Sequence, residues 1–434
     1  MMKIAIIGAG ITGLTIANKL LKRGHEIKGF ESKQPGGLAF GFPFPDGKDI
    51  YLDKYYHHIF KSDREIIRLI QENGLESDLV WLESKSGIFS EGQTWPLSTL
   101  RDLLACFPIG SLWQRLLMGW NLYDFRQRSD WKHLDAVRCR EFFEQRGNLI
   151  GYKNLWEPLL QQKYSDAFDE IPASFLWGRI HPRSQSREKG KETLGYLRGG
   201  FQRLILSMVE SIQKRGGVIT TGNPILQIVS GDKPEVIYRK GREVFDRVVC
   251  TIGLNLLSSL VKDISQEIKQ KAISIEYMAV TCLIIVMKKR QGDFYWLNNI
   301  DPGVSFGAVI EHTNFVSPEH YGGNYILYVV NYHRHSHDLN RLKAREVLNM
   351  HLPSLRKVFP DFSQKDIVCI YLFKDSHSSP LYDLWFSERI PPYQGWLPNV
   401  DICSMAQVYP EDRNMNHCIQ NALNYVTRFC ENSC

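Results

Sequence analysis

The 434-residue sequence predicts an α/β fold in which a domain built on a parallel sheet carries an inserted α+β domain. Two observations lead to this prediction. Residues 3–31 have the pattern of a strand, a glycine-rich turn, a helix and a second strand, and a further series of strands and a helix follows between Gly195 and Gly253 after a long interruption. Strands that alternate with helices are typical of parallel sheets, and an interruption of this length has room for a second domain.

The first strand and its turn have the composition of a dinucleotide-binding unit. Lys3–Ile7 is an apolar run of the kind that a buried parallel strand shows, and Gly8, Gly10 and Gly13 follow it in GxGxxG spacing. Gly8 permits the tight turn, Gly10 allows a pyrophosphate to approach the backbone, and Gly13 lets the next helix pack closely on the strand. The alternative is a glycine-rich turn without a ligand.

The helix and the second strand complete this Rossmann-like unit. The helix N-terminus, with Ile11 and Thr12, directs free N–H groups and the positive end of the helix dipole toward phosphates. Glu31 ends the second strand 18 residues after Gly13, where an acid accepts hydrogen bonds from ribose hydroxyls and repels a 2′-phosphate. Because NAD and FAD share an ADP half, the unit predicts a dinucleotide and leaves both cofactors open.

Composition and charge narrow the class of partner. The chain is 43% hydrophobic and 23% charged, as expected of a globular protein, and 12% aromatic, which suits an aromatic-lined pocket or a large core. The net charge of +6 is mild, and the basic stretches at 179–191 and 288–290 contain no interleaved aromatic residues. We therefore expect solvated loops and no nucleic-acid partner, with an anionic substrate or a membrane surface as the alternative.

The cysteines and the apolar runs bear on location. Nine scattered cysteines with no CxxC pair indicate a reduced, cytoplasmic protein. No run approaches the roughly 18 apolar residues that span a bilayer, and the longest, Met278–Met287, fits a buried strand. Residues 100–125 are rich in Leu and Trp with interspersed Arg. They predict a helical cap over a substrate cavity, and a segment in peripheral contact with a membrane is the alternative.

The later segments divide between the two domains. A helix is predicted at 204–214, followed by strands at 218–221, 225–229, 235–239 and 247–251. Further strands are predicted at 280–287, 325–331 and 367–373, with helices near 340–352 and from about residue 414. We therefore expect a discontinuous cofactor domain (1–74, 195–265 and 396–434) and a substrate or cap domain formed by a helical insert (75–194) and a mixed β/α insert (266–395).

Several pieces of the chain carry a resemblance to a known superfamily. They are Gly8–Gly13 with Glu31, the Gly36-Gly37-Leu38 turn, the Gly199-Gly200 turn with Asn223-Pro224-Ile225, the strand ending at Thr251, and Tyr409–Asn416 before the last helix. Together they resemble the FAD-dependent amine oxidase, protoporphyrinogen oxidase and phytoene desaturase group, to which UDP-galactopyranose mutase is related. The segments Tyr56–Phe60 and Glu311–Phe315 resemble those of a bacterial subgroup called protoporphyrinogen-oxidase-like.

The resemblance implies FAD as the cofactor, and the single GxGxxG motif agrees because it leaves no second nucleotide site. In the family pattern Glu31 binds the adenosine ribose, the backbone near Ile225 meets the adenine, and further contacts fall on Ser32, Gly36, Gly37, Leu38, Thr251 and Glu411. The helix start Asn414-Met415-Asn416 lies against the flavin pyrimidine, where helix N–H groups stabilise an anion. A plain helix cap at Asn414 fits the same sequence.

Two pairs of residues are the candidates for catalysis. By similarity to the mutase, His58 contacts the flavin and His57 is a substrate-side acid or base, because histidine titrates near neutrality. Glu311 and His312 form the second pair, of which only one can face the cleft because neighbours on a strand point to opposite faces. For each pair a structural role is the alternative. Aromatic and polar residues that line either the pocket or the core are Tyr295, Trp296, Asn314 and Tyr332.

The leading hypothesis is an FAD-dependent oxidoreductase that oxidises or desaturates a small or lipid-linked organic substrate by hydride transfer. A redox-neutral mutase acting on a nucleotide-linked or lipid-linked sugar, a protoporphyrinogen oxidase and a flavin-bound scaffold are the alternatives. No metal site is expected, because the alternating His333, His335 and His337 have only the neighbouring Asp338 to complete a ligand set.

Overall fold

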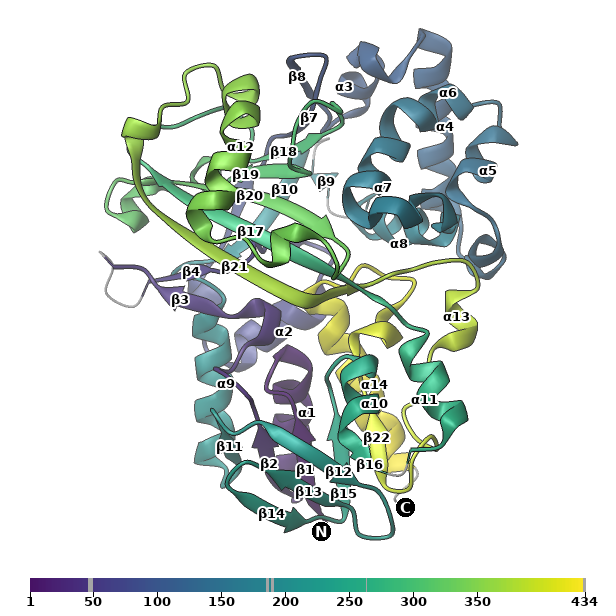
Figure 1. Ribbon diagram of the computed structural model, residues 1–434, viewed down its shortest axis with the longest axis vertical. Helices are drawn as coiled ribbons and strands as arrows, with labels where there is room; N and C mark the ends of the chain where they lie inside the picture. Colours follow the sequence, from purple (N-terminus) through teal and green to yellow (C-terminus); the bar gives the residue numbers. More distant parts are fainter. Residues whose placement is uncertain (46–49, 185–186, 189–190, 263, 432–434) are drawn as a thin grey trace.

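The computed structural model describes residues 1–45, 50–184, 187–188, 191–262 and 264–431. It has two halves (Figure 1). The lower half holds a parallel sheet, a small second sheet and the last helix, and the upper half holds a larger sheet and a group of helices. The chain crosses between the halves several times, so each half is assembled from segments far apart in the sequence.

The lower half is built on five parallel strands in the order β11-β2-β1-β15-β22. Their bounds are Lys3–Ile7 for β1, Glu26–Phe30 for β2, Val218–Thr220 for β11, Arg247–Cys250 for β15 and Val400–Ile402 for β22. Alternation along β1 assigns its side chains to the two faces of the sheet. Ile4 and Ile6 pack with α1 (Ile11–Leu21), α9 (Gln202–Lys214) and α14 (Met415–Glu431), which cover one face.

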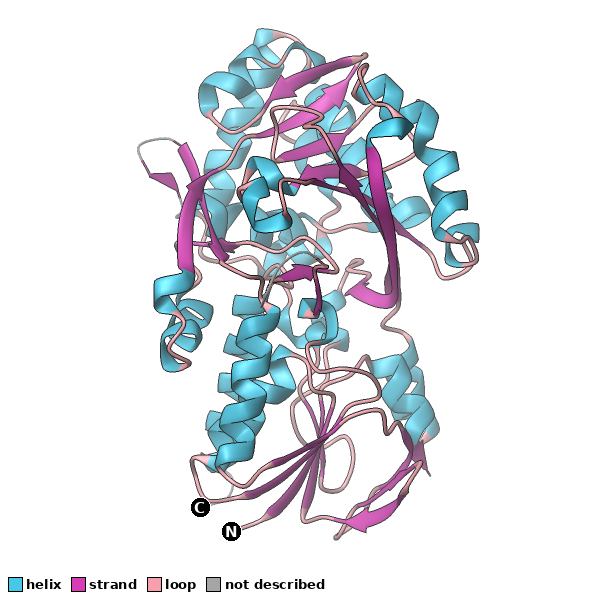
Figure 2. Ribbon diagram, turned by 90° about the vertical axis from the view of Figure 1, so that its left-hand side faces the viewer, coloured by secondary structure: helices cyan, strands magenta, loops and turns pink. Residues whose placement is uncertain are grey.

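A second sheet covers the other face, where Ala5 and Ile7 lie. It has the order β14-β13-β12-β16, with bounds Ile225–Val229 for β12, Glu235–Tyr238 for β13, Gly241–Val244 for β14 and Val261–Lys262 for β16. Figure 2 shows the parallel strands between helices on one side and this small sheet on the other. The strands and the helix predicted between residues 204 and 251 are confirmed.

The upper half is organised by a seven-stranded sheet in the order β21-β17-β20-β19-β18-β7-β8. The strands are Ile367–Pro380 (β21), Tyr277–Met287 (β17), Tyr325–His333 (β20), Ala308–Glu311 (β19), Trp296–Asn299 (β18), Ser86–Ser90 (β7) and Gln93–Pro96 (β8). Every residue of β17 is buried, because α12 (Ala344–Val358) and its neighbours pack on one face of the sheet and the lower half packs on the other. The three predicted strands of this region are confirmed.

The helical insert expected at 75–194 also contains strands, which the sequence analysis missed. β6 (Leu79–Glu83) and β10 (Lys191–Leu197) pair with each other and with β5 (Ile59–Phe60), and β7 runs parallel to β18. These strands are short, and β6 is partly exposed along its length, so their apolar pattern is weak beside that of the long helices that follow. The division of the chain into cofactor and cap domains remains a prediction.

The remaining elements complete the two halves. The helices of the upper right in Figure 1 are α3 (Leu100–Ala105), α4 (Leu112–Gln127), α5 (Cys139–Glu144), α6 (Leu149–Gly151), α7 (Glu157–Tyr164) and α8 (Ala173–Ser184). The others are β3 (Gly41–Pro43), β4 (Tyr51–Asp53), β9 (Arg187–Glu188), α2 (Arg64–Glu72), α11 (Gln266–Ile273) and α13 (Phe386–Arg389). Among the helices of the described chain, none combines the length and the apolar character that crossing a membrane requires.

Candidate active site

A cavity of about 1160 Å³ runs from the glycine-rich turn after β1, past the start of α14, to the helices of the upper half. Residues of both halves line it. This volume exceeds the range of about 300–1,000 Å³ that is typical of a pocket for one small ligand. The cavity therefore has room for an elongated cofactor and a second molecule.

The turn between β1 and α1 forms one end of the cavity. Gly8, Gly10, Ile11 and Thr12 line it, and no side chain caps the first turn of α1. A Cβ atom added at Gly10 would meet no described atom within 4 Å, so the backbone there faces open space. A Cβ added at Gly13 would lie 2.0 Å from the Gly8 carbonyl oxygen, so Gly13 allows α1 to pack against the turn. This end fits a pyrophosphate, which binds to free N–H groups at a helix N-terminus.

Glu31 lies at the end of β2, beside this turn. Its carboxylate accepts hydrogen bonds from the Ala9 N–H at 3.0 Å and the Lys33 N–H at 2.9 Å. Ser32, Gly36, Gly37 and Leu38 also line the cavity, as does Thr251, whose hydroxyl donates to the Ile7 carbonyl at 2.9 Å. A carboxylate in this position suits ribose hydroxyls.

The start of α14 lies farther along the cavity. Asn414 and Met415 line it, and the Asn414 side chain accepts a hydrogen bond from the His417 N–H at 2.8 Å, so Asn414 caps the helix and borders the cavity at once. Asn416 points elsewhere: its side-chain oxygen accepts from the N–H groups of Glu65 and Ile66 at 2.8 and 3.2 Å at the start of α2. Asn416, Ile225 and Glu411 are absent from the described lining.

The two helix N-termini, the open space at Gly10 and the carboxylate of Glu31 fit an elongated dinucleotide. The positive ends of the helix dipoles at both helix starts favour anionic groups. Cofactor binding by the individual residues predicted from the sequence remains a prediction.

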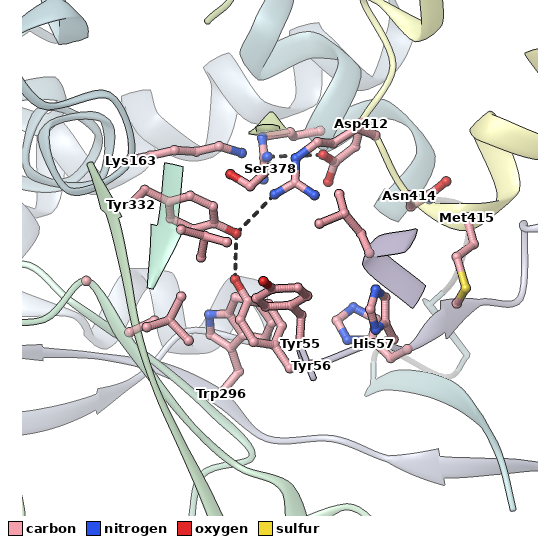
Figure 3. A pocket seen from close by; sticks show the side chains of 18 of the residues that line it. Tyr55, Tyr56, His57, Lys163, Trp296, Tyr332, Ser378, Asp412, Asn414 and Met415 are labelled. Atoms are coloured by element: carbon pink, nitrogen blue, oxygen red, sulfur yellow. Dashed lines mark hydrogen bonds and ion pairs between the residues drawn. The ribbon is translucent and has the colours of Figure 1, made fainter. Parts of the chain in front are cut away.

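The adjacent histidines His57 and His58 line the cavity, and Figure 3 shows His57 beside it. Burial, with the charge of Arg413 as a further cause, lowers the pKa of His57 to about 4, so its ring is neutral at neutral pH. Its Nδ1 atom is buried and has no hydrogen-bond partner within the described chain. His58 lies toward the upper half, with its Nδ1 atom 3.2 Å from the Tyr295 hydroxyl and its ring against Trp296.

A chain of polar groups crosses the cavity beside these histidines. The Arg413 guanidinium donates to the Tyr332 hydroxyl at 3.1 Å, and the hydroxyls of Tyr332 and Tyr56 lie 2.8 Å apart (Figure 3). These side chains come from the segment before α14, from β20 and from the loop after β4. The guanidinium therefore bridges the two halves of the molecule at the cavity.

The far end of the cavity combines cations with an apolar wall. Arg126 on α4, Lys163 on α7 and Arg179 on α8 line it with Arg413. Arg179 pairs with Asp412 at 3.1 Å, and the Nε atoms of Arg179 and Arg413 are buried without a hydrogen-bond partner in the part of the chain that is described. The apolar lining is Ile88, Leu97, Leu103, Leu122, Leu155, Trp156, Leu159, Leu160, Leu176 and Ile180.

Glu311 and His312 lie outside the described lining of the cavity, so the expectation that one of them faces the cleft does not match the structure. The Glu311 carboxylate accepts from the N–H groups of Gln291 and Gly292 at 2.7 Å each, and burial raises its pKa to about 7. His312 is buried against Tyr321, whose hydroxyl lies 2.7 Å from Nε2, and burial lowers its pKa to about 3. Both side chains therefore have structural roles in the packing of the upper half.

The aromatic candidates are placed in two ways. Tyr295, Trp296 and Tyr332 line the cavity, whereas Asn314 donates to the carbonyls of Gly292 and Phe294 and supports a loop. Within the described residues, no group of three or more His, Cys, Asp or Glu side chains is arranged to hold a metal ion.

Asp53 at the end of β4 lies where the halves meet. Its carboxylate accepts from the Tyr196 hydroxyl at 3.0 Å and the Phe201 N–H at 3.2 Å, and its carbonyl accepts from the Tyr328 hydroxyl at 2.7 Å. Burial raises the pKa of Asp53 to about 7 despite these donors. An ionisable carboxyl group therefore lies at the start of the loop that carries His57.

The residues that sequence analysis missed are the cations Arg126, Lys163, Arg179 and Arg413. Arg413 directly precedes the Asn414 segment, so its position beside a helix start was a usable signal. Lys163 lies in a helix that carries no motif. Arg179 begins the basic stretch 179–191, which was expected to be a solvated loop with an anionic substrate or a membrane surface as the alternative.

A sequence model described as flavin containing amine oxidoreductase matches residues 11–385. A segment of 110 residues, 25% of this chain, is 30% identical to the zeta-carotene desaturase of Zea mays, of whose length it spans only 18%.

Two solved structures are similar over nearly the full length of the chain. An oxidoreductase from Methanosarcina mazei has a TM-score of 0.75 at 16% identity, covering 98% of this chain and 100% of that one. Reduced UDP-galactopyranose mutase has a TM-score of 0.75 at 15% identity, covering 99% and 96%. At these identities the likeness shows the fold alone.

Proposed function

We propose that this chain, which belongs to the flavin containing amine oxidoreductase family, is an FAD-dependent oxidoreductase whose substrate has a long apolar body and an anionic group. One observation carries the substrate proposal: a single cavity joins the dinucleotide end to a region lined by leucines and by four cationic side chains. Apolar walls bury a hydrocarbon body, and arginine forks recognise carboxylate or phosphate.

The residues that would hold FAD are those of the glycine-rich turn, Glu31 and the start of α14. When bound, the cofactor accepts a hydride from a substrate carbon. The chain itself contributes free N–H groups for the pyrophosphate, a carboxylate for ribose hydroxyls, and the positive end of α14 for the anionic ring.

The polar groups beside the reacting position orient the substrate. Arg413 remains a cation and donates to Tyr332, which lets the Tyr332 hydroxyl interact with Tyr56 or with a substrate oxygen. His57 has a pKa of about 4, so at neutral pH it stays neutral and serves better as a hydrogen-bond partner than as a base. We therefore assign His57 to positioning the substrate or the cofactor.

The second candidate function is a redox-neutral mutase acting on a nucleotide-linked or lipid-linked sugar. The same cations favour it, because Arg126, Lys163, Arg179 and Arg413 can hold a diphosphate as well as a single anionic group. The fold shared with UDP-galactopyranose mutase is compatible with this reaction.

Anaerobic reduction of the bound flavin distinguishes the two candidates. The purified holoenzyme is mixed without oxygen with isoprenoid phosphates, acyl chains with a carboxylate, amines and nucleotide sugars, and the flavin absorbance is followed. We expect an anionic isoprenoid or acyl compound to bleach the flavin, whereas polyamines of similar length do not. The assignment of substrate class is wrong if only cationic amines bleach it.

The mutase candidate has its own readout. Sugar rearrangement that requires prior reduction by dithionite, and consumes no reductant during turnover, would establish it in place of net oxidation. If the reduced enzyme leaves nucleotide sugars and lipid-linked sugars unchanged, the mutase is excluded.

We place the protein in the cytoplasm. Eight cysteines are described, all as free thiols, and six of them are buried. Unpaired buried thiols suit a reducing compartment, because the fold uses them as small apolar side chains.

A further inference from the structure

An exposed apolar face lies on the α3–α4 region of the upper half. Along α4, Trp113, Leu116, Trp120 and Tyr123 follow one another at steps of three and four residues, with exposed fractions of 66%, 47%, 65% and 51%. This spacing puts them on one side of the helix. Four further exposed side chains extend the set, and together we call them the α3–α4 face: Leu100, Phe107, Leu112 and Ile150.

The other side of α4 is already packed against the protein. Arg115, Met118, Asn121 and Phe125 are buried there. A helix that has one covered side and a second apolar side in water lacks a partner for the second side. Elsewhere in the described chain, the large apolar side chains with similar exposure are scattered over separate elements.

The α3–α4 face is held in one shape. Ser111 and Gln114 form a capping box at the start of α4, and Thr99 and Asp102 form another at the start of α3. The Arg115 guanidinium donates to the Leu104 carbonyl and lies 4.6 Å from the centre of the Phe107 ring, which ties α3 to α4. The exposed side chains are therefore presented by a fixed surface.

The composition of this face is that of a lipid interface. Tryptophan and tyrosine favour the headgroup region because their rings have an apolar body and a polar edge. Between Leu100 and Tyr123 the one acidic residue is Asp102, which is occupied in the capping box, while Arg101 is exposed beside Leu100. Such a surface attracts anionic headgroups, and the described residues 100–123 carry no free carboxylate that a basic partner could bind.

The α3–α4 face is continuous with the cavity. Leu100 and Tyr123 belong to the face and also line the cavity, and Leu103, Gly119 and Leu122 line it directly behind them. A protein partner seated here would cover this end of the cavity. A bilayer would instead supply the cavity with apolar molecules that carry anionic headgroups. Such compounds match the apolar wall and the cations at the far end of the cavity.

We propose that the α3–α4 face docks on a lipid bilayer that contains anionic lipids, so that the cavity opens toward the membrane surface. The step from docking to uptake of substrate rests on the proposed function, whereas docking itself does not. The face lies on the surface of the bilayer, since no described helix is suited to span it.

Vesicle flotation of the holoenzyme tests the docking. Vesicles of phosphatidylcholine with phosphatidylglycerol are compared with vesicles of phosphatidylcholine alone. We expect the wild-type protein to float with the anionic vesicles. The triple variant Trp113→Gln, Leu116→Gln, Trp120→Gln should lose roughly tenfold or more of its partitioning, because it lacks three apolar side chains that the bilayer would bury.

The matched control replaces exposed apolar residues elsewhere: Trp385→Gln, Val244→Gln and Val368→Gln, with exposed fractions of 53%, 50% and 49% in the wild type. This control should float like the wild type. Arg101→Gln should weaken binding to the anionic vesicles by a few fold and leave the low binding to neutral vesicles unchanged. None of these side chains lines the cavity.

The outcomes separate the proposal from its competitors. The proposal is overturned if the wild-type holoenzyme floats with neither vesicle, or if both triple variants float equally well. It is also overturned if light scattering shows a dimer that only the α4 triple variant dissociates, because the face is then an interface between two copies. Flavin bleaching in detergent is measured separately, so loss of flotation with intact bleaching counts against docking alone, and the reverse result counts against the proposed function alone.

Discussion

The two ends of the cavity are built in different ways. The dinucleotide end is made largely of backbone from the short stretch between Gly8 and Leu38, where glycines remove obstacles and amides provide donors. The far end is made of side chains from α4, α7, α8, β20 and the segment before α14, which meet only in the folded protein. In the proposed function, backbone geometry selects the kind of cofactor and the assembled side chains select the substrate.

This difference predicts how each end fails. A change at the dinucleotide end affects folding or cofactor content, because the backbone there is at once structure and ligand site. A change at the far end affects turnover and leaves the cofactor in place. Three predictions test this contrast, from the largest effect to the smallest.

Two glycine substitutions separate the structural and binding roles of the turn. Gly13→Ala should destabilise the fold by about 3 kcal/mol or more, because its Cβ would lie 2.0 Å from a carbonyl oxygen that cannot move away. Gly10→Ala should leave a folded protein with little FAD, because its Cβ enters space that is open in the protein and suits the pyrophosphate. Soluble yield, thermal unfolding and the ratio of FAD to protein measure the two effects.

Equal loss of folding in the two variants would contradict this prediction, because it would mean that the space at Gly10 is part of the packed structure. Gly231→Ala serves as the control for a glycine substitution in general, since nothing lies within 4 Å of its added Cβ, its φ is outside the left-handed region, and it is absent from the cavity lining.

Replacement of Arg413 tests the far end. Arg413→Met should lower turnover by about a hundredfold, because it removes a preorganised cation and the donor to Tyr332. FAD content should stay near that of the wild type. Steady-state kinetics on the substrate found by flavin bleaching, together with FAD absorbance, provide the measurements.

Arg203→Met is the matched control, since Arg203 pairs with Asp78 at a partly exposed site away from the cavity lining. Arg413→Lys should recover part of the lost turnover because it keeps the charge while losing the guanidinium fork. If Arg413→Met loses FAD and retains turnover per bound flavin, Arg413 belongs to the cofactor end, and the two ends of the cavity do not differ in the way stated.

Asp53, which lies where the two halves of the molecule meet, is tested through the pH dependence of folding stability. Its pKa of about 7 in the folded protein exceeds the value of 3.8 for an unperturbed aspartate, so the folded state binds an extra proton between these values. Its stability therefore falls as pH rises from about 4 to about 7 and levels off above that. Asp53→Asn removes this cost, and its Oδ1 can accept from the Phe201 N–H while its Nδ2 donates to the Tyr196 hydroxyl oxygen. Between pH 5 and 8 the variant should gain about 2–3 kcal/mol relative to the wild type.

Denaturant unfolding of both proteins at several pH values measures this difference. The buried His57, His312 and His351 have lowered pKa values and lose stability in the opposite direction, as pH falls through 6.5, but they are common to both proteins and cancel in the comparison. A constant difference between the two proteins across this pH range would show that Asp53 does not change its proton in the folded state.

The same contrast explains what could be predicted from the sequence. Local patterns placed β1, α1, β2 and the strands of 218–251 because each depends on neighbours in the chain. The strands β6, β7 and β8 were missed because they are short: β6 takes its partner β10 from far along the chain, and β7 and β8 form a hairpin of five and four residues with little apolar alternation. The local motif around Glu311 and His312 does not show whether these side chains are buried. In the structure Glu311 is buried against the N–H groups of Gln291 and Gly292, and His312 is buried against Tyr321.

Asn416 shows how one turn of a helix divides residues between two tasks. The sequence places Asn414, Met415 and Asn416 together at a helix start, but the first two border the cavity and Asn416 turns away to cap α2. Lys163 and Arg179 illustrate the converse. They converge on the cavity from separate helices, and only tertiary packing brings them together.

The position of β22 has a consequence for how the molecule is made. β1 is the centre of the parallel sheet, yet β15 and β22, on the same side of it, begin at residues 247 and 400, and α14 packs against α1 only after that. During synthesis on the ribosome the glycine-rich turn therefore emerges early and waits with the apolar side of α1 uncovered. Pairing over such distances is slow and exposes the growing chain to aggregation. The last strand and the last helix are therefore needed to complete the sheet and to cover the α1 that follows the glycine-rich turn.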